Sequence, residues 1–304
     1  MNLQRNILIA ALLVITYLMV LQWNKDYDQQ ELPPAASTAP ASTSDLPDVP
    51  ATATGQIDSD VPQAAEPASA PQAADSAEAV PAGQLVQVST DTLNVSIDPV
   101  GGDIVAVSLP QYPMRKDRPD LPFQLLEQSG GRTYIAQSGL AGANGPDARA
   151  AGRPRYETES TRYAMDEGAD SLTVDLNFEE AGVSYTKRFT FTRGDYLIGV
   201  EYLIDNQSAE NWTGNLFGQI KRDGSSDPSS SSATGMATYL GAAYWSKEGD
   251  YTKIPMGDMD DTRLRESNTG GWIAWLQHYF VSAWVPGAEQ THVYQTRKDT
   301  QGNY

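Results

Sequence analysis

Hydrophobic and polar residues follow three different patterns along this chain of 304 residues. An apolar run covers residues 7–23 and is broken by only two polar side chains, Thr16 and Gln22. Residues 24–84 show neither a helical nor a strand-like hydrophobic period. From residue 85 onward, apolar residues recur at alternate positions in many segments, which is typical of β-strands with one buried face. The pattern therefore divides the chain into three parts.

The clearest alternation lies in three consecutive segments, at residues 172–178, 183–191 and 196–204. Two acidic residues, an alanine and a glycine at 179–182 separate the first two segments, and an Arg-Gly-Asp sequence at 193–195 separates the second from the third. Glycine permits the positive φ that tight turns often require, so both separators are interpreted as hairpin turns. We therefore predict an antiparallel meander of three strands.

Further apolar runs predict strands before and after this meander. Residues 93–97 and 104–109 flank a segment with a proline and two glycines, which predicts a hairpin or a strand–loop–strand unit. Residues 272–276 and 279–285 predict two more strands, with a short helix as the alternative. Long helical periodicity is absent from the sequence after residue 84. The predicted fold class is mainly β, an antiparallel sandwich of about 220 residues in one domain.

The apolar run at residues 7–23 has the length and flanks of a membrane anchor. Its 17 residues span about 26 Å as a helix, close to the roughly 30 Å hydrocarbon core of a bilayer. Arg5 precedes the run, so the positive-inside rule predicts that the N-terminus lies in the cytoplasm. A cleaved signal peptide is the alternative, but the first Ala-rich stretch starts at Ala35, too far along for a cleavage site. The residues expected to form the anchor are Ile7, Leu8, Leu12, Leu13, Ile15, Leu18, Leu21 and Trp23.

Charge and proline content distinguish a linker from the folded part. The chain has 21 basic and 39 acidic residues and a formal net charge of −18. Residues 24–84 hold ten of the acids, one base and nine of the nineteen prolines, whereas residues 85–304 hold 29 acids and 19 bases. A segment with the composition of residues 24–84 cannot bury enough apolar surface to fold, so we expect these residues to form a disordered acidic tether. The excess of acid also argues against a nucleic acid partner, which requires a basic face.

The sequence offers little material for catalysis or metal binding. The absence of cysteine excludes disulfides, thiolate metal sites and cysteine nucleophiles. His278 and His292 have no carboxylate at a spacing that would fix a tautomer, and we interpret them as a turn residue and a half-exposed strand residue. The acidic run from Asp258 to Asp261 lacks the turn glycine of a calcium loop and is interpreted as a solvated loop. We therefore predict no catalytic residue, no metal and no cofactor.

Aromatic residues concentrate in the last quarter of the chain. Residues 221–268 combine a polar, loop-like sequence with four rings that are candidates for a transient partner surface: Tyr239, Tyr244, Trp245 and Tyr251. Aromatic anchors supply much of the binding energy in such interfaces. The alternatives are that rings of this region form a core between two sheets, or line a groove for a sugar or an extended polypeptide.

Short sequence islands run in order along the chain outside the linker. They are Gln4-Arg5-Asn6, Thr90-Asp91, Gly101-Gly102-Asp103, Pro122-Phe123-Gln124-Leu125-Leu126-Glu127, Gln137-Ser138-Gly139-Leu140, Gly145-Pro146-Asp147, Arg193-Gly194-Asp195-Tyr196, Phe217-Gly218-Gln219, Gly241-Ala242-Ala243-Tyr244, Gly270-Gly271-Trp272, Tyr279-Phe280 and Ala283-Trp284. With these islands the chain resembles the YidC membrane-protein insertase family of bacteria with two membranes.

The resemblance implies three parts. Residues 1–23 would be a transmembrane signal anchor, residues 24–84 a linker, and residues 85–304 a periplasmic β-supersandwich similar to the sugar-mutarotase fold. In the family a further bundle of transmembrane helices carries the insertion groove, and none of that bundle is present in this sequence. The chain therefore resembles an N-terminal fragment, whose last domain can be incomplete at its C-terminal end.

The function implied by the resemblance is that of a non-enzymatic insertase and chaperone, which inserts, folds and assembles inner-membrane proteins with or without the Sec translocon. The N-terminus would lie in the cytoplasm and the β domain in the periplasm. The partners implied are the Sec translocon with its accessory subunits, nascent inner-membrane proteins and the lipid bilayer, and this fragment would serve in partner contact. The alternative is a periplasmic glycan-binding or mutarotase-like carbohydrate-active protein, although the shortage of histidine argues against the enzyme.

Overall fold

The structure is a computed structural model, and it describes four stretches of the chain, residues 85–228, 238–247, 249–260 and 263–304. All of them belong to the unit Gly55–Tyr304, one of two units into which the chain divides. The predicted anchor and tether lie outside the described residues. Within the four described stretches, no helix is long and apolar enough to cross a membrane.

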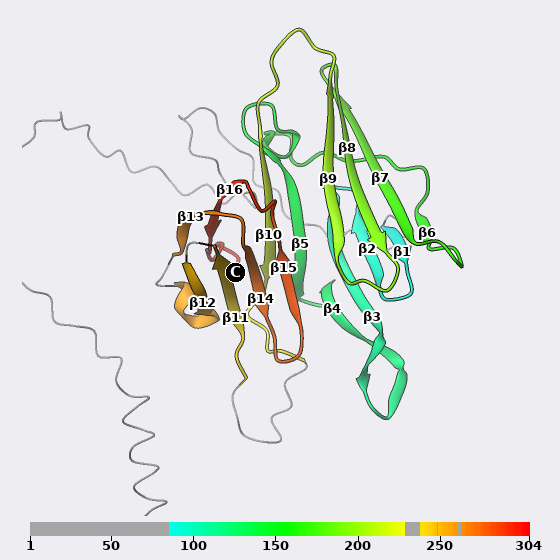
Figure 1. Cartoon of the computed structure of the whole chain (residues 1–304), viewed down its shortest axis with the longest axis vertical. Coiled ribbons are helices and arrows are strands. Elements are labelled where there is room, and N and C mark those ends of the chain that lie inside the picture. Colours follow the sequence, from blue (N-terminus) through cyan, green and yellow to red (C-terminus); the bar gives the residue numbers. More distant parts are fainter. Residues whose placement is uncertain (1–84, 229–237, 248, 261–262) are drawn as a thin grey trace, which may run out of the picture. The chain divides into compact units, whose positions relative to one another are not determined.

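β-Strands make up most of the described chain (Figure 1). In chain order they are β1 (Val86–Ser89), β2 (Asn94–Asp98), β3 (Asp103–Arg115), β4 (Arg118–Ser129), β5 (Arg132–Ala141), β6 (Arg162–Ala164), β7 (Ser171–Glu180), β8 (Val183–Thr192), β9 (Ile198–Asn206), β10 (Asn215–Arg222), β11 (Gly241–Ser246), β12 (Gly249–Pro255), β13 (Arg265–Thr269), β14 (Trp272–Leu276), β15 (Val281–Trp284) and β16 (Thr291–Gln295). Short 3-10 helices are η2 (Pro146–Ala148) and η4 (Met256–Asp260). The mainly β fold class predicted from the alternating pattern is confirmed.

The largest sheet has seven strands in the order β10-β5-β4-β3-β2-β1-β6. Neighbouring strands pair antiparallel except β1 and β6, which run parallel with Gln87 opposite Arg162. Gly101 and Gly102 have positive φ values of 75° and 66° in the turn between β2 and β3. β2 and β3 pair antiparallel across this turn, so of the two predicted arrangements the structure has the hairpin.

The predicted meander is confirmed as a three-stranded sheet in the order β7-β8-β9. Along β8, side chains are alternately buried and partly exposed, as the sequence pattern requires. Leu176 and Phe189 of this sheet share a hydrophobic core with Val88 and Ile97 of the seven-stranded sheet. The two sheets therefore pack face to face, and Figure 1 shows β7–β9 beside β1 and β2.

The remaining strands form a four-stranded sheet, β12-β11-β14-β15, and the pair β13–β16. Ile254 and Trp275 bring one face of the four-stranded sheet into the same core. The two strands predicted near the C-terminus are β14 and β15, and they pair antiparallel. β15 begins later than the sequence pattern indicates because the Gln277 amide donates to the Phe280 carbonyl oxygen at 2.9 Å and closes a turn.

The structure differs from the prediction of a loop-like sequence at residues 221–268. This stretch contains β11 and β12 and most of β13. β11 pairs with β14 and β13 pairs with β16, and both partners lie farther along the chain. The pattern of polar residues within 221–268 alone therefore could not predict these strands. The acidic run is part of η4 as far as Asp260, and Asp261 lies outside the described residues.

Candidate functional site

The pairing register of the four-stranded sheet sorts its side chains onto two faces. Residues opposite each other on antiparallel strands project to the same face, and neighbours along a strand project to opposite faces. Trp245 of β11 lies opposite Trp272 of β14. Tyr244, one residue earlier, lies opposite Thr252 of β12. Trp245 and Trp272 therefore share one face, and Tyr244 projects to the other.

The face that carries Trp245 is turned away from the core, and we call it the outer face. Trp245 is 39% exposed, Tyr251 is 47% exposed and Val281 is 55% exposed. The ring centroids of Tyr251 and Trp272 lie 5.9 Å apart, so aromatic surface spans β12, β11 and β14. By the strand registers, the outer face comprises Gly241, Ala243, Trp245, Tyr251, Lys253, Pro255, Trp272, Ala274, Leu276, Val281 and Ala283, and of these Ala243 and Ala274 are buried beneath their neighbours.

Tyr244 lies on the inner face of the same sheet. It is 7% exposed, its hydroxyl donates to Oε2 of Glu266 at 2.8 Å, and its ring centroid lies 6.2 Å from that of Tyr294. The sequence pattern predicted one candidate partner surface that included Tyr244 together with Tyr239, Trp245 and Tyr251. The structure places Tyr244 in the core, whereas Trp245 and Tyr251 lie on the outer face and Tyr239 lies at its end.

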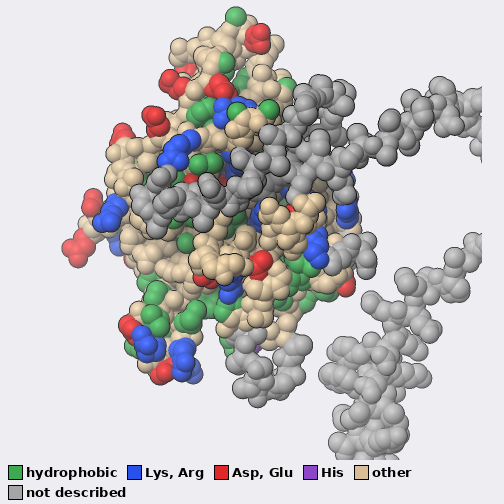
Figure 2. Space-filling model, turned by 180° about the vertical axis from the view of Figure 1, so that it is seen from behind, with side chains coloured by type: hydrophobic (Ala, Val, Ile, Leu, Met, Phe, Trp, Pro, Cys, Tyr) green, Lys and Arg blue, Asp and Glu red, His purple; other side chains and the backbone are tan. Residues whose placement is uncertain are grey.

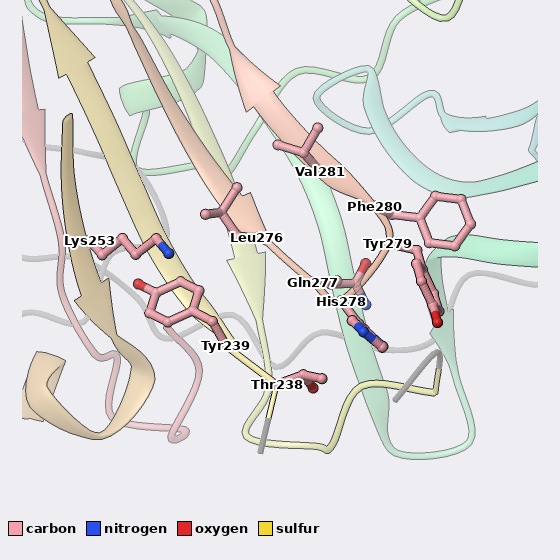
Figure 3. Close-up of a pocket in the computed structure, with 9 residues that line it drawn as sticks. All are labelled: Thr238, Tyr239, Lys253, Leu276, Gln277, His278, Tyr279, Phe280 and Val281. Carbon is pink, nitrogen blue, oxygen red and sulfur yellow. The ribbon is translucent and has the colours of Figure 1, made fainter. Parts of the chain in front are cut away.

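A hollow of about 420 Å³ lies at this end of the outer face (Figure 3). Tyr239 and Lys253 line one side, the turn between β14 and β15 lines the other, and Leu276 lies between them. Nζ of Lys253 lies 4.8 Å from the ring centroid of Tyr239 and 5.8 Å from that of Tyr251. Both distances are within the range of cation–π contacts. The hollow therefore combines apolar walls with a positive charge held by two rings.

Tyr239 is fixed at the rim of the hollow by its hydroxyl, which donates to the carbonyl oxygen of Ala242 at 2.6 Å. Burial raises the pKa of Tyr239 to about 12. The hydroxyl therefore keeps its proton at neutral pH and remains a donor. The ring is held in one orientation beside Lys253, as a binding surface requires.

A buried carboxylate holds the turn on the far side of the hollow. Asp227 accepts a hydrogen bond from the backbone amide of His278 at 2.8 Å. The His278 ring stacks on Tyr279 with centroids 3.9 Å apart, and Tyr279 is 71% exposed. Phe280 turns toward the protein and stacks on Phe123 with centroids 4.2 Å apart. In this turn the Tyr279 ring is therefore exposed to solvent, whereas the Phe280 ring packs against the protein and fixes the turn.

The chemistry of these residues suits non-covalent binding. His278 is exposed in a turn and His292 is partly buried on β16, as interpreted from the sequence. Among the described residues, no group of three or more His, Asp or Glu side chains is placed to hold a metal ion. Flat rings with polar edges bind apolar and aromatic groups well. The outer face can therefore bind an apolar segment of another molecule.

Comparison with known proteins identifies the family. A family model described as the YidC periplasmic domain matches residues 85–304. The membrane protein insertase YidC of Stutzerimonas stutzeri (strain A1501) is 57% identical over 304 residues, which is 100% of this chain and 54% of that protein. The proteins of the same name from Azotobacter vinelandii (strain DJ / ATCC BAA-1303) and Pseudomonas aeruginosa (strain UCBPP-PA14) are 54% and 53% identical over 100% of this chain, covering 54% and 56% of their own length. This chain belongs to the YidC family.

The match places the candidate site within the YidC periplasmic domain. The outer face and the hollow both lie within residues 85–304, the part that the family model covers. The chain spans about half the length of the curated YidC relatives it matches.

A cluster of charged side chains is buried between the seven-stranded and three-stranded sheets of this YidC domain. Arg153 forms ion pairs with Asp103 and Asp147, the latter with Nε and Oδ1 2.8 Å apart. Lys187 of β8 donates two hydrogen bonds of 3.0 Å to backbone carbonyl oxygens. Burial lowers the pKa of Lys187 to about 7. These contacts join β8 to the opposite sheet, so we interpret the cluster as structural.

The sequence did not indicate Lys253 as a residue of the site, and Trp272 and Tyr279 were expected only among the rings of a core or a groove, not on the partner surface. A signal was present, because β11 and β14 have apolar or aromatic residues at successive positions, without the polar alternation of the meander. A strand that is apolar on both faces is buried on both, or keeps one face for a partner. That pattern could have located the outer face, but it could not have indicated its partner.

Proposed function

We propose that this chain supplies the membrane anchor and the periplasmic contact domain of a membrane-protein insertase. The proposal rests on membership of the YidC family and on the aromatic outer face of the four-stranded sheet. In this proposal the N-terminus lies in the cytoplasm, residues 7–23 cross the inner membrane, and residues 85–304 act in the periplasm. The domain contacts partners and does not perform catalysis.

We propose apolar segments of nascent inner-membrane proteins as the molecules that the outer face binds. Trp245 lies opposite Trp272 on the neighbouring strand, and the ring centroid of Tyr251 lies 5.9 Å from that of Trp272. Large rings desolvate apolar partners at little cost in conformational entropy, so they commonly dominate binding energy. An extended chain that has left a translocon and has not yet folded offers the matching apolar side chains. The Sec translocon and its accessory subunits would deliver such chains and be further protein partners.

Lys253 adds a feature that a purely apolar surface would lack. Its ammonium group is held by the rings of Tyr239 and Tyr251 at the entrance to the hollow. A cation at this point favours segments that carry an acidic residue next to an apolar stretch. The hollow would then fix the position of a bound segment along the outer face.

A binding measurement with matched variants tests this proposal. In the full chain held in lipid nanodiscs, Trp245→Ser combined with Tyr251→Ser should weaken binding of a fluorescent apolar peptide by about tenfold or more, because both aromatic anchors are lost. Leu203 on β9 is also an exposed apolar residue, so Leu203→Ser is the control and should leave the affinity unchanged. Equal affinities for the double variant and the unsubstituted chain would refute the proposal.

Carbohydrate binding is a second candidate function, and the residues that line the hollow favour it. Tyr239 and Tyr279 present rings, and Lys253 presents a donor, within a volume of about 420 Å³ that could hold a sugar. Rings with nearby polar groups are common in sugar sites. Titration of the full chain with a panel of glycans distinguishes the two functions. Saturable binding of one glycan, abolished by Tyr239→Ala and unaffected by Leu203→Ser, would favour the carbohydrate function.

A further inference from the structure

β3 and β4 extend past the body of their sheet as a two-stranded arm, which we define as residues 110–121. Every residue of the arm is exposed, whereas Leu109 and Phe123 on either side of it are buried. Arg115 lies opposite Arg118 where the chain reverses. Figure 1 shows the arm reaching away from the remaining strands at the lower right.

Three large apolar or aromatic side chains of the arm are exposed to solvent. Tyr112, Met114 and Leu121 are between 42% and 47% exposed. Figure 2 shows hydrophobic side chains gathered at the lower left, directly above a tip of basic and acidic groups. An apolar surface of this kind on a projecting element marks a contact site.

The root of the arm is braced, so its direction is fixed. An irregularity in the pairing of β3 and β4 lies between Leu109 and Pro113, and Tyr112 stands within it. The Tyr112 ring centroid lies 6.0 Å from that of Tyr196 and 5.9 Å from that of Phe280. These contacts join the arm to two other sheets of the domain.

The tip carries the densest group of basic residues in the chain. Arg115, Lys116 and Arg118 fall within four residues, and no other window of four residues in the sequence holds three bases. Ion pairs with Asp117 and Asp120, each at 3.0 Å, leave the tip with a net positive charge. Residues 85–304 as a whole are acidic, so the charge of the tip is opposite in sign to the net charge of the domain.

Four prolines argue against another β-strand as the partner of the arm. Pro110, Pro113 and Pro119 of the arm, and Pro122 directly after it, have no backbone N–H group, so the arm cannot offer a continuous ladder of donors at its edges. Its side chains are therefore the groups available for contact.

We propose that the arm binds the surface of an anionic lipid bilayer. Tyrosine favours the level of the headgroups, Met and Leu side chains suit the boundary with the acyl chains, and Arg and Lys pair with lipid phosphates. The arm combines all three kinds of side chain within residues 112–121. Charge complementarity selects an anionic membrane over a neutral one, and it selects lipid over a protein of the same acidic character as this domain.

The absence of cysteine makes a site-specific fluorescence test straightforward. Pro119→Cys at the tip and Glu210→Cys in the connection from β9 to β10 each introduce a single thiol for an environment-sensitive dye. Figure 1 shows that this connection lies at the opposite end of the described domain from the arm. The full chain is placed in bilayers of phosphatidylcholine with phosphatidylglycerol, whose acyl chains carry bromine as a contact quencher.

We expect quenching of the dye at position 119 and none at position 210. Replacing Arg115 and Arg118 by Gln should lower the ratio of bound to free arm by about fivefold for each residue in anionic bilayers. Met114→Ser with Leu121→Ser leaves Tyr112 and its ring contacts in place, so it should abolish quenching while the domain stays folded. Equal quenching at both positions, or none at position 119, would overturn the proposal. A spectral shift without quenching would indicate contact with protein and would overturn it as well.

Discussion

Lys187 links the stability of the domain to pH at the scale of one residue. Its amine is fully buried, next to Asp103, Asp147 and Arg153, and the rings of Phe189 and Tyr202 lie within cation–π range. Burial lowers the pKa of Lys187 from 10.5 to about 7. Between these two values the unfolded chain binds a proton that the folded chain does not bind. The free energy of unfolding therefore increases as the pH rises through this range.

We expect the free energy of unfolding to increase as the pH rises from about 7 toward 10.5, with a slope of at most about 1.4 kcal/mol per pH unit. Denaturant titrations across this window measure the slope. Lys187→Met has a side chain of similar length without a proton to release, so its curve should lack this increase. Parallel curves for both proteins would show that Lys187 does not titrate in this range.

At the scale of one element, β11 contains neighbouring rings with opposite roles. Tyr244 is packed in the core and donates a hydrogen bond to Glu266, whereas Trp245 lies on the outer face. Tyr244→Ala should lower the free energy of unfolding by about 3–5 kcal/mol, because it removes a buried ring and leaves a cavity. Trp245→Ala should cost about 1 kcal/mol or less, as expected for a substitution on the surface.

Denaturant unfolding of the two variants measures this difference. Tyr244→Phe is the conservative control and should lose about 1 kcal/mol, since it removes the hydroxyl and keeps the ring. Similar losses for Tyr244→Ala and Trp245→Ala would contradict the assignment of the two faces.

Elements made by local pairing could be predicted from the sequence. The meander β7-β8-β9 has strict alternation and turn residues between adjacent strands, so both its register and its buried side follow from short-range pattern. The parallel pairing of β1 with β6 could not be predicted, because it joins Gln87 to Arg162 with no sequence signal at either strand. The two faces of β11 also depend on pairing with β14, which lies about thirty residues farther along.

At the scale of the whole molecule, the sequence indicated the fold class and the kinds of residue at the site but not their arrangement. It named Tyr239, Trp245 and Tyr251, and the structure adds Lys253 and Trp272 from neighbouring strands. The buried cluster of Asp103, Asp147, Arg153 and Lys187 was not foreseen, because the sheets bring its members together from separate segments. The division at residues 23 and 84 into anchor, tether and domain stays a prediction.

The central claim is that the outer face contacts polypeptide in a working YidC protein, and photo-crosslinking of stalled insertion intermediates tests it most directly. A photoreactive amino acid replaces Tyr251 on the outer face, or the similarly exposed Leu203 on β9 as the control. The chain, joined to the remaining part of a YidC relative such as that of Stutzerimonas stutzeri, is expressed in bacterial membranes with an inner-membrane protein stalled during synthesis. We expect a crosslink to the nascent chain from position 251 and none from position 203. Equal crosslinking from both positions, or none from position 251, would contradict the account.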